Sequence, residues 1–395
     1  MMDYQSLMNK RIQQVKPSGI RKFFDIAEEM DDVISLGVGE PDFRTPWHIR
    51  EVAIDSLDSG KTRYTSNAGL LELRREITEY YRRRFHVEYA YRTDVIVTVG
   101  GSEAIDLCVR TLIDEGDEVL IPEPSFVCYT PITEMAGGIA KPIPTQAKNE
   151  FRLTPEEVRA AITPKTKLLI LPYPNNPTGA VMRREHLEAI AEVLRGTNVM
   201  VLSDEIYAEL TYGDTPHISI ASIEGMQERT IVVNGFSKTY SMTGWRLGYA
   251  LGPGEIIKQM TKLHQFAIMS APTTSQYAAI EGLRNGDGDV QEMASEYDAR
   301  RRLTVDGFRA LGLDCFEPEG AFYVFPCIKS SGLTSDEFCE KLLYSQKVAL
   351  VPGTAFGTTS GEGFIRASYC YSVSHLKEAL RRIGLFLDEL KKNEG

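Results

Sequence analysis

Five short apolar runs constrain the fold of this chain more than any other feature of its sequence. The runs are Val95–Val99, Glu118–Ile121, Lys167–Leu171, Asn198–Leu202 and Thr230–Asn234. Their apolar residues are nearly continuous, which is typical of strands buried on both faces of a parallel sheet. Amphipathic stretches of helical period lie around them, at Trp47–Leu57, Gly69–Phe85, Ser102–Ile113, Thr154–Ile162 and Arg184–Leu194. Strands that alternate with helices predict an α/β doubly wound domain over residues 46–285.

The last part of the chain has a different character. Val290–Leu311 predicts one long, highly charged helix, which is a natural connector. Short strands and helices are expected beyond it, at Ala321–Pro326, Ser335–Gln346, Val348–Val351, Gly363–Tyr369 and Ser374–Leu390. We therefore expect a smaller α+β domain at residues 286–395. Residues 1–45 are expected to form an N-terminal arm and part of this small domain.

The composition excludes several classes of protein. The 395 residues include 44 Lys and Arg against 55 Asp and Glu, and the resulting net charge of −11 argues against nucleic-acid binding. Neither a run of 18 apolar residues nor a signal peptide is present, so no membrane partner is expected. The six cysteines are scattered and form no C-x-x-C pair. This pattern excludes a disulfide framework and the common zinc motifs, predicts no metal site and fits a cytoplasmic protein.

Residues that can bind or react with a ligand come after four of the predicted strands. They are Gly101, Ser102 and Glu103 at a helix start, Asn176 in PYPNNPTG, Asp204 and Tyr207 in SDEIY, and Lys238 in GFSKT with Arg246 eight residues on. Each alone is explained by a helix cap, a turn or a surface salt bridge. Together they lie where open α/β sheets bind ligands, beyond the carboxyl ends of the strands. A carboxylate and an amine at buried strand ends are costly to desolvate, so they need a ligand or each other.

These residue types suit one ligand. A helix N-terminus binds phosphate, and Arg246 can add a bidentate contact. The amine of Lys238, once neutral, can condense with an aldehyde, and the carboxylate of Asp204 can hold a pyridine nitrogen protonated. Asn176 and Tyr207 can hold a phenolate oxygen beside the imine. These requirements match pyridoxal 5′-phosphate.

Seven segments carry a resemblance to a known family. They are SLGVGEPDF, YTSNAGLLELR, PYPNNPTG, SDEIY, SKTYSMTGWRLGY, GAFYVFP and VPGTAFG, and they run in family order from about Val33 to Tyr369. The chain resembles the class I/II pyridoxal-phosphate-dependent aminotransferases of fold type I, in particular the aspartate/aromatic group. The resemblance implies a mostly parallel central sheet with helices on both faces and a smaller α+β domain.

The resemblance also implies cofactor contacts. Lys238 is similar to the Schiff-base lysine that moves the proton between substrate and cofactor, and Asp204 to the partner of the pyridine nitrogen. Asn176 and Tyr207 would bond the 3′-oxygen of the ring, and Phe126 would stack on it, although core packing explains Phe126 equally well. The expected phosphate contacts are Gly101, Ser102, Glu103, Ser237 and Arg246. Many relatives carry Ser or Thr where this chain has Gly235, so the assignment of Ser237 is weaker than that of Arg246.

For the substrate, the resemblance implies that Arg366 clamps the α-carboxylate, helped by Asn176 and by the backbone N–H of Gly39. Tyr64 resembles the tyrosine that reaches the phosphate in the neighbouring subunit, which implies a homodimer with shared active sites.

The expected reaction is a ping-pong transfer of the amino group from an L-amino acid to a 2-oxo acid, with 2-oxoglutarate as the expected acceptor. The segment Ser18–Phe24 falls where relatives place a mobile segment over the substrate. Its Ile20, Phe23 and Phe24 favour an apolar lid that suits aromatic or large neutral substrates, although ordinary packing explains them equally well. Arg21 and Lys22 keep aspartate open as a substrate. Two alternatives remain: a C–S lyase with the same cofactor, and a non-catalytic effector-binding regulator.

Overall fold

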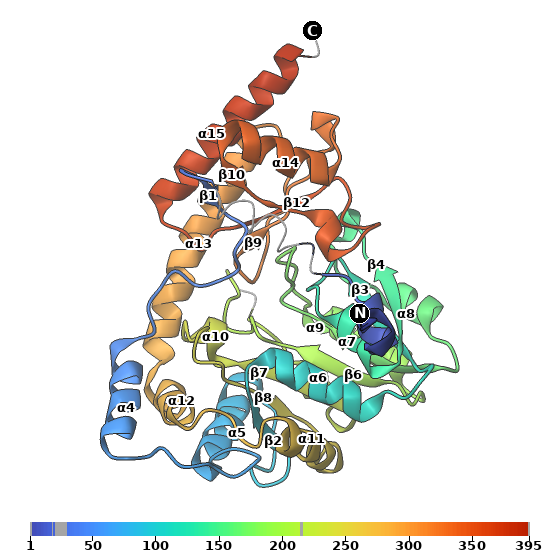
Figure 1. Ribbon diagram of the computed structural model, residues 1–395, viewed down its shortest axis with the longest axis vertical. Coiled ribbons are helices and arrows are strands. Elements are labelled where there is room, and N and C mark those ends of the chain that lie inside the picture. The colour runs from blue at the N-terminus through green and yellow to red at the C-terminus, as the bar shows by residue number, and fades with distance from the viewer. Residues whose placement is uncertain (1, 18, 20–29, 214–215, 394–395) are drawn as a thin grey trace.

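The central element is a seven-stranded sheet in the part of the chain that the structure, a computed structural model, describes: residues 2–17, 19, 30–213 and 216–393 (Figure 1). In spatial order its strands are β2 (Val95–Thr98), β8 (Gly248–Leu251), β7 (Thr230–Gly235), β6 (Met200–Asp204), β5 (Thr166–Leu171), β3 (Glu118–Glu123) and β4 (Ile139–Pro144). β8 is antiparallel to β2 and β7, and all the other neighbours are parallel. The predicted mostly parallel sheet is confirmed, and the carboxyl ends of β5, β6 and β7 meet at one edge.

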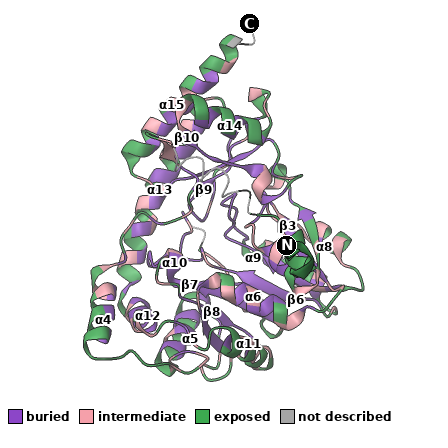
Figure 2. Ribbon diagram, viewed as in Figure 1, coloured by how far each residue is buried: buried purple, intermediate pink, exposed green. Residues whose placement is uncertain are grey.

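Helices cover both faces of the sheet because successive strand residues point to opposite faces. Val95 and Val97 of β2 pack into one core, and Ile96 packs into the other. The first face is covered by α4 (Trp47–Asp58), α5 (Leu71–Phe85), α8 (Pro155–Ala161), α9 (Arg184–Leu194) and α12 (Thr273–Asn285), and the second by α6 (Gly101–Leu112), α7 (Tyr129–Ala136) and α11 (Gly254–Ala267). Figure 2 shows the strands buried between helices whose outer sides are exposed.

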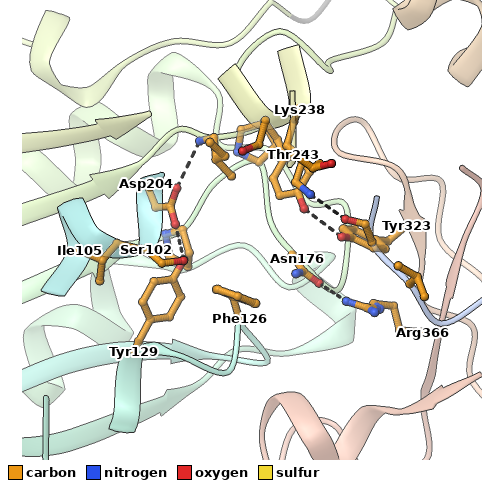
Figure 3. A pocket seen from close by; sticks show the side chains of 18 of the residues that line it. Ser102, Ile105, Phe126, Tyr129, Asn176, Asp204, Lys238, Thr243, Tyr323 and Arg366 are labelled. Carbon is orange, nitrogen blue, oxygen red and sulfur yellow. Dashed lines mark hydrogen bonds between the residues drawn. The ribbon is translucent and has the colours of Figure 1, made fainter. Parts of the chain in front are cut away.

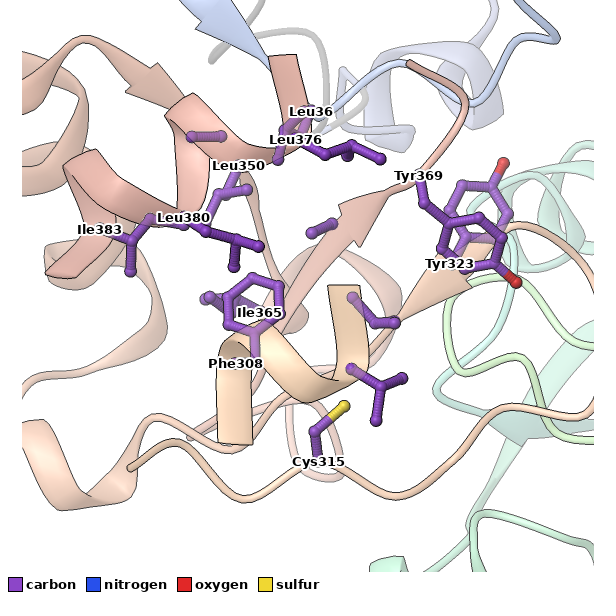
Figure 4. Close-up of a cluster of buried hydrophobic side chains, with 14 of the residues drawn as sticks. Leu36, Phe308, Cys315, Tyr323, Leu350, Ile365, Tyr369, Leu376, Leu380 and Ile383 are labelled. Atoms are coloured by element: carbon purple, nitrogen blue, oxygen red, sulfur yellow. The ribbon is translucent and has the colours of Figure 1, made fainter. Parts of the chain in front are cut away.

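A smaller unit lies at the far end of α13 (Asp287–Ala310), the long charged helix that the sequence predicted (Figure 1). It contains the helices α14 (Ser335–Gln346) and α15 (Val373–Asn393) and the short strands β9 (Tyr323–Val324), β10 (Val348–Ala349), β11 (Val351–Pro352) and β12 (Ile365–Ser368). β1 (Ile34–Ser35) pairs with β10, so the N-terminal segment joins this unit. Its core contains Leu36 from that segment beside Leu350 and Leu376 (Figure 4).

Several elements were not predicted. Most residues of β4 are exposed and two are prolines, which an edge strand tolerates. β8 is only four residues long and begins with a glycine, so it leaves a weak strand signal. The helices α7, α11 and α12 were also missed, and the strand expected at Ala321–Pro326 shrinks to two residues. By contrast, Thr154 and Glu157 form the predicted capping box at the start of α8.

The described residues of the N-terminal part contribute little regular structure before β1. Two short helices, α1 (Tyr4–Leu7) and α2 (Lys10–Gln14), precede β1. The proposed lid residues Ile20, Arg21, Lys22, Phe23 and Phe24 lie outside the described residues. Within the described residues, none of the helices is long and apolar enough to cross a membrane. The division into domains at residues 45 and 285 stays a prediction.

Candidate active site

A cavity of about 330 Å³ lies at the carboxyl edge of the sheet, facing the smaller unit (Figure 3). It is lined by residues that are far apart in the sequence and come from both parts of the molecule. The predicted site residues that line it are Gly39, Gly101, Ser102, Phe126, Asn176, Asp204, Tyr207, Ser237, Lys238, Arg246 and Arg366. The structure therefore brings together nearly all the residues that the sequence singled out.

Lys238 reaches the cavity from α10 (Phe236–Thr239), a single helical turn that follows directly after β7. Its Nζ donates a hydrogen bond of 2.6 Å to the carbonyl of Gly39 and lies 5.5 Å from the centre of the Phe322 ring. Burial lowers the pKa of Lys238 to about 8 because the charged ammonium is desolvated there. A neutral amine, which is a nucleophile and a base, is therefore accessible near physiological pH.

Asp204 ends β6 and is buried. Its Oδ2 accepts a hydrogen bond of 2.7 Å from the hydroxyl of Tyr129, and its Oδ1 accepts one of 3.2 Å from the backbone N–H of Ile206 (Figure 3). Burial raises the pKa of Asp204 to about 6, and the two hydrogen bonds offset part of that rise. No basic side chain forms a salt bridge with this carboxylate in the described part of the chain, so it faces the cavity as an uncompensated acid.

Arg366 enters the cavity from β12 of the smaller unit. Its Nη1 donates to Oδ1 of Asn176 at 2.8 Å, and its Nη2 donates to the carbonyl of Gly37. The guanidinium carbon lies over the rings of Tyr323 and Phe356, at 4.5 and 4.7 Å from their centres. Nε is buried and has no hydrogen-bond partner among the described residues. A buried guanidinium with a spare donor is suited to a carboxylate.

The N-terminus of α6 and Arg246 form a tight cradle. Gly100 caps the helix with φ +81°, and a Cβ there would lie 2.7 Å from Nη2 of Arg246. A Cβ on Gly248 of the neighbouring strand would lie 2.6 Å from the backbone of Gly100 and Gly101. Only glycines allow this close approach of backbone and guanidinium. The free backbone N–H groups of the helix and the guanidinium together favour an anion.

The comparison with known proteins identifies the family. Residues 31–383 match the family described as aminotransferase class I and II. The chain belongs to the class I and II aminotransferases. It is 47% identical to an aspartate aminotransferase of Pyrococcus abyssi (strain GE5 / Orsay), over 97% of this chain and 99% of that protein. It is 43% identical to aromatic-amino-acid aminotransferase 2 of Thermococcus litoralis (strain ATCC 51850 / DSM 5473 / JCM 8560 / NS-C), with the same coverage.

A solved structure agrees. The crystal structure of an aromatic aminotransferase from Pyrococcus horikoshii OT3 superposes with a TM-score of 0.90 at 44% identity, covering 93% of this chain and 99% of that one. Structural neighbours of this kind confirm the α/β fold of type I as well as the family. The chain is thus an aminotransferase, and hence an enzyme of the transferase class.

Two predicted residues of this aminotransferase lie away from the cavity lining. The carboxylate of Glu103 points back into the protein, where it accepts the backbone N–H of Val99 and pairs with Nδ1 of the buried His264 at 2.7 Å. Only its backbone at the helix start remains near the cradle. Tyr64 is 81% exposed and does not line the cavity of its own chain.

Gly235, the departure from the family pattern, lies at the end of β7. A Cβ there would meet the backbone of Leu247 and Gly248 at 3.1 Å and the side chain of Ile206 at 3.2 Å. A larger residue would therefore require its neighbours to give way. Ser237, the expected substitute, lines the cavity.

Several lining residues of this aminotransferase were missed from the sequence: Gly37, Val38, Ile105, Tyr129, Pro172, Pro174, Ile206, Thr243 and Tyr323. Tyr323 lies within GAFYVFP, and its hydroxyl is 2.9 Å from that of Tyr207. A Cβ on Gly39 would lie 1.9 Å from the same hydroxyl, which requires glycine at position 39. The signal for Tyr129 was its place three residues after Phe126, in the sequence FVCY.

Proposed function

We propose that this aminotransferase uses pyridoxal 5′-phosphate to move an amino group from an aromatic, acidic or other large L-amino acid to a 2-oxo acid, with 2-oxoglutarate as the principal acceptor. One observation carries the proposal: a single cavity gathers an amine of lowered pKa, a buried carboxylate and two guanidinium groups, and an anion-binding helix start lies beside them.

The residues present fit this cofactor. Burying a charged group without compensation is costly, and among the described residues the buried carboxylate of Asp204 has no salt bridge while the buried Nε of Arg366 has no hydrogen-bond partner. The glycines at positions 100 and 248 leave room for backbone N–H groups to approach a phosphate. Phe126 lines the cavity and is half-buried, as a stacking ring requires.

Each residue then has a defined role. Pyridoxal phosphate, when bound, supplies an aldehyde that condenses with amines and a ring that accepts electrons. Lys238 would hold the aldehyde, and Asp204 would pair with the ring nitrogen. Asn176 and Tyr207 would bond the ring oxygen. The phosphate would be held by Arg246, the hydroxyls of Ser102 and Ser237, and the backbone at Gly101 and Glu103.

Lys238 also moves the proton. Its lowered pKa makes the free amine a base of useful strength, since a catalytic base works best when its pKa lies near the working pH. The hydrogen bond from Nζ to the carbonyl of Gly39 holds the amine in the same cavity that Arg366 lines. From there it can take a proton from the α-carbon of an amino acid and return it elsewhere.

Arg366 would bind the α-carboxylate of the substrate. Its Nη1 is already oriented by Asn176, and the rings of Tyr323 and Phe356 restrict its movement. The backbone N–H of Gly39 would give the same carboxylate a second donor. Asp204, Lys238 and Tyr207 form the catalytic group around this clamp.

We also propose a homodimer in the cytoplasm. The exposed Tyr64 would serve the phosphate site of the other subunit, so that each site is shared. The six cysteines are all free thiols, which favours a reducing compartment.

The ionisation of the two catalytic groups predicts a pH window. Attachment of pyridoxal phosphate to the ligand-free protein should accelerate as pH rises through about 8, because Lys238 loses its proton there rather than near 10.5. Retention should fall as pH drops through about 6, because Asp204 takes up a proton there rather than near 3.8. Stopped-flow absorbance measures the rate of attachment, and equilibrium dialysis measures retention, whose fall near pH 6 we call the acid limb. Asp204→Asn should abolish the acid limb, and attachment that accelerates only above pH 10 would contradict the interpretation of Lys238.

A substrate panel tests the function. Aromatic, acidic and neutral L-amino acids are each supplied with 2-oxoglutarate, and formation of glutamate is measured. Cystathionine without a 2-oxo acid is the parallel assay, in which pyruvate and ammonia would indicate the C–S lyase. Glutamate formation with at least one donor class is expected. The absence of both reactions in protein that retains the cofactor would favour the non-catalytic regulator.

A further inference from the structure

Tyr129 is the first residue of α7 and has no role in the function proposed so far. Its side chain is 2% exposed, and among the described residues its hydroxyl has one partner, Oδ2 of Asp204, at 2.7 Å. The ring packs edge-on against Phe126, with centres 6.1 Å apart, among the apolar side chains beneath α6. A buried hydroxyl needs a hydrogen-bond partner, and here that partner is a single carboxylate, so the burial of the phenol and the ionised state of Asp204 depend on each other.

The hydrogen bond has a fixed direction. Burial, and then the neighbouring Asp204, raise the pKa of Tyr129 well above its usual value, so the phenol keeps its proton and acts as the donor. Asp204 sits at the end of a strand and its Oδ1 accepts the N–H of Ile206. The two donors hold the carboxylate in one orientation at the cavity wall (Figure 3).

The other groups around Asp204 do not replace this contact. From α7, the buried thiol of Cys128 stays uncharged, because burial raises its pKa well above the usual value. From the segment after β6, Glu205 disfavours the ionised form of Asp204, although its carboxylate accepts from Ser203 and Ser219. Across the cavity are the phenol of Tyr207 and the cations Lys238 and Arg246, neither of which bonds Asp204.

We propose that Tyr129 is a positioning residue that keeps Asp204 ionised and oriented, so that the carboxylate can hold a ring nitrogen in its protonated form. This inference rests on the proposed function and adds a residue to it. Without the phenol, the carboxylate would lose its strongest donor in an apolar site, and the shared proton would move from the ring nitrogen to Asp204. The ring would then be a weaker electron acceptor.

The test compares wild type, Tyr129→Phe and Tyr369→Phe. Tyr369 is the matched control because it is a buried tyrosine whose hydroxyl donates to a carbonyl, that of Ala321 at 3.1 Å, away from Asp204. Binding of pyridoxal phosphate is measured by dialysis from pH 5 to 9, and the ring nitrogen is observed by NMR with ¹⁵N-labelled cofactor. A hydrogen bond to a charged group shifts an ionisation by about one to two pH units. Tyr129→Phe should therefore raise the pH at which the cofactor is lost by about that amount, and it should move the ¹⁵N signal toward the position of an unprotonated nitrogen. Tyr369→Phe should change neither quantity.

A double-mutant cycle separates this role from packing. In an Asp204→Asn background there is no charge to stabilise, so adding Tyr129→Phe should leave affinity unchanged within about twofold. An equal loss in both backgrounds would overturn the inference. If Tyr129→Phe does not fold, 3-fluorotyrosine at position 129 keeps the shape with a stronger donor and should move the acid limb to lower pH. An unchanged acid limb and an unchanged ¹⁵N signal in these variants would also overturn the inference about Tyr129. A wild type that does not bind the cofactor, or that binds it with an unprotonated ring nitrogen, would instead refute the proposed function itself.

Discussion

Replacing Lys238 by alanine is expected to lower kcat by on the order of 10⁴- to 10⁶-fold, because one side chain supplies both the nucleophile and the base. The cavity offers no second amine that could replace it, because its other cations among the described residues are the guanidinium groups of Arg246 and Arg366. A guanidinium does not lose its proton at any pH that the protein tolerates. Steady-state kinetics with the best donor from the substrate panel, together with the cofactor content after gel filtration, measure the effect.

Two further variants sharpen this result. Lys238→Arg keeps the positive charge but not the ability to become neutral, so it should be as inactive as alanine. Lys167→Ala is the control, because Lys167 lies near the amino-terminal end of β5, away from the cavity lining, where it pairs with Asp117 at 2.9 Å, and the activity of this variant should equal that of wild type. Turnover of Lys238→Ala within tenfold of wild type would refute the assignment of Lys238.

Replacing Asp204 by alanine should lower kcat by on the order of 10³-fold, the scale of losing one preorganised electrostatic contact at a reacting centre. Its position at the end of β6, buried and bonded by Tyr129 and Ile206, leaves no other carboxylate lining the cavity among the described residues. The variant should also release pyridoxal phosphate more readily, as dialysis would show.

The isosteric Asp204→Asn isolates the charge. It keeps the size of the side chain and an oxygen that can accept from Tyr129, so a loss close to that of alanine would assign the effect to ionisation rather than to packing. Asp55→Asn, at an exposed position on α4, serves as the control. A near-normal rate for Asp204→Asn would contradict the proposed pairing with a ring nitrogen.

Much of the fold was predictable because buried parallel strands leave a strong local signal. Leu168, Leu169 and Ile170 of β5 are apolar in succession, and the structure buries all three. The edge strand β4 left no such signal, since one face of its pattern is exposed to solvent. The place of Leu36 in the core of the smaller unit was also beyond local reasoning, because its neighbours Leu350 and Leu376 lie more than three hundred residues later in the chain.

The sequence by itself determined the chemical groups of this protein: the carboxylate at 204 and the amine at 238, which follow buried strands, and the guanidinium groups at 246 and 366. Residue types and their distance from a buried strand are local properties, so they can be read along the chain. Only the tertiary structure decided which groups meet. It turned the carboxylate of Glu103 toward His264 and set the hydroxyl of Tyr129 against Asp204, because hydrogen bonds across a core depend on packing between helices and strands that sequence distance does not record.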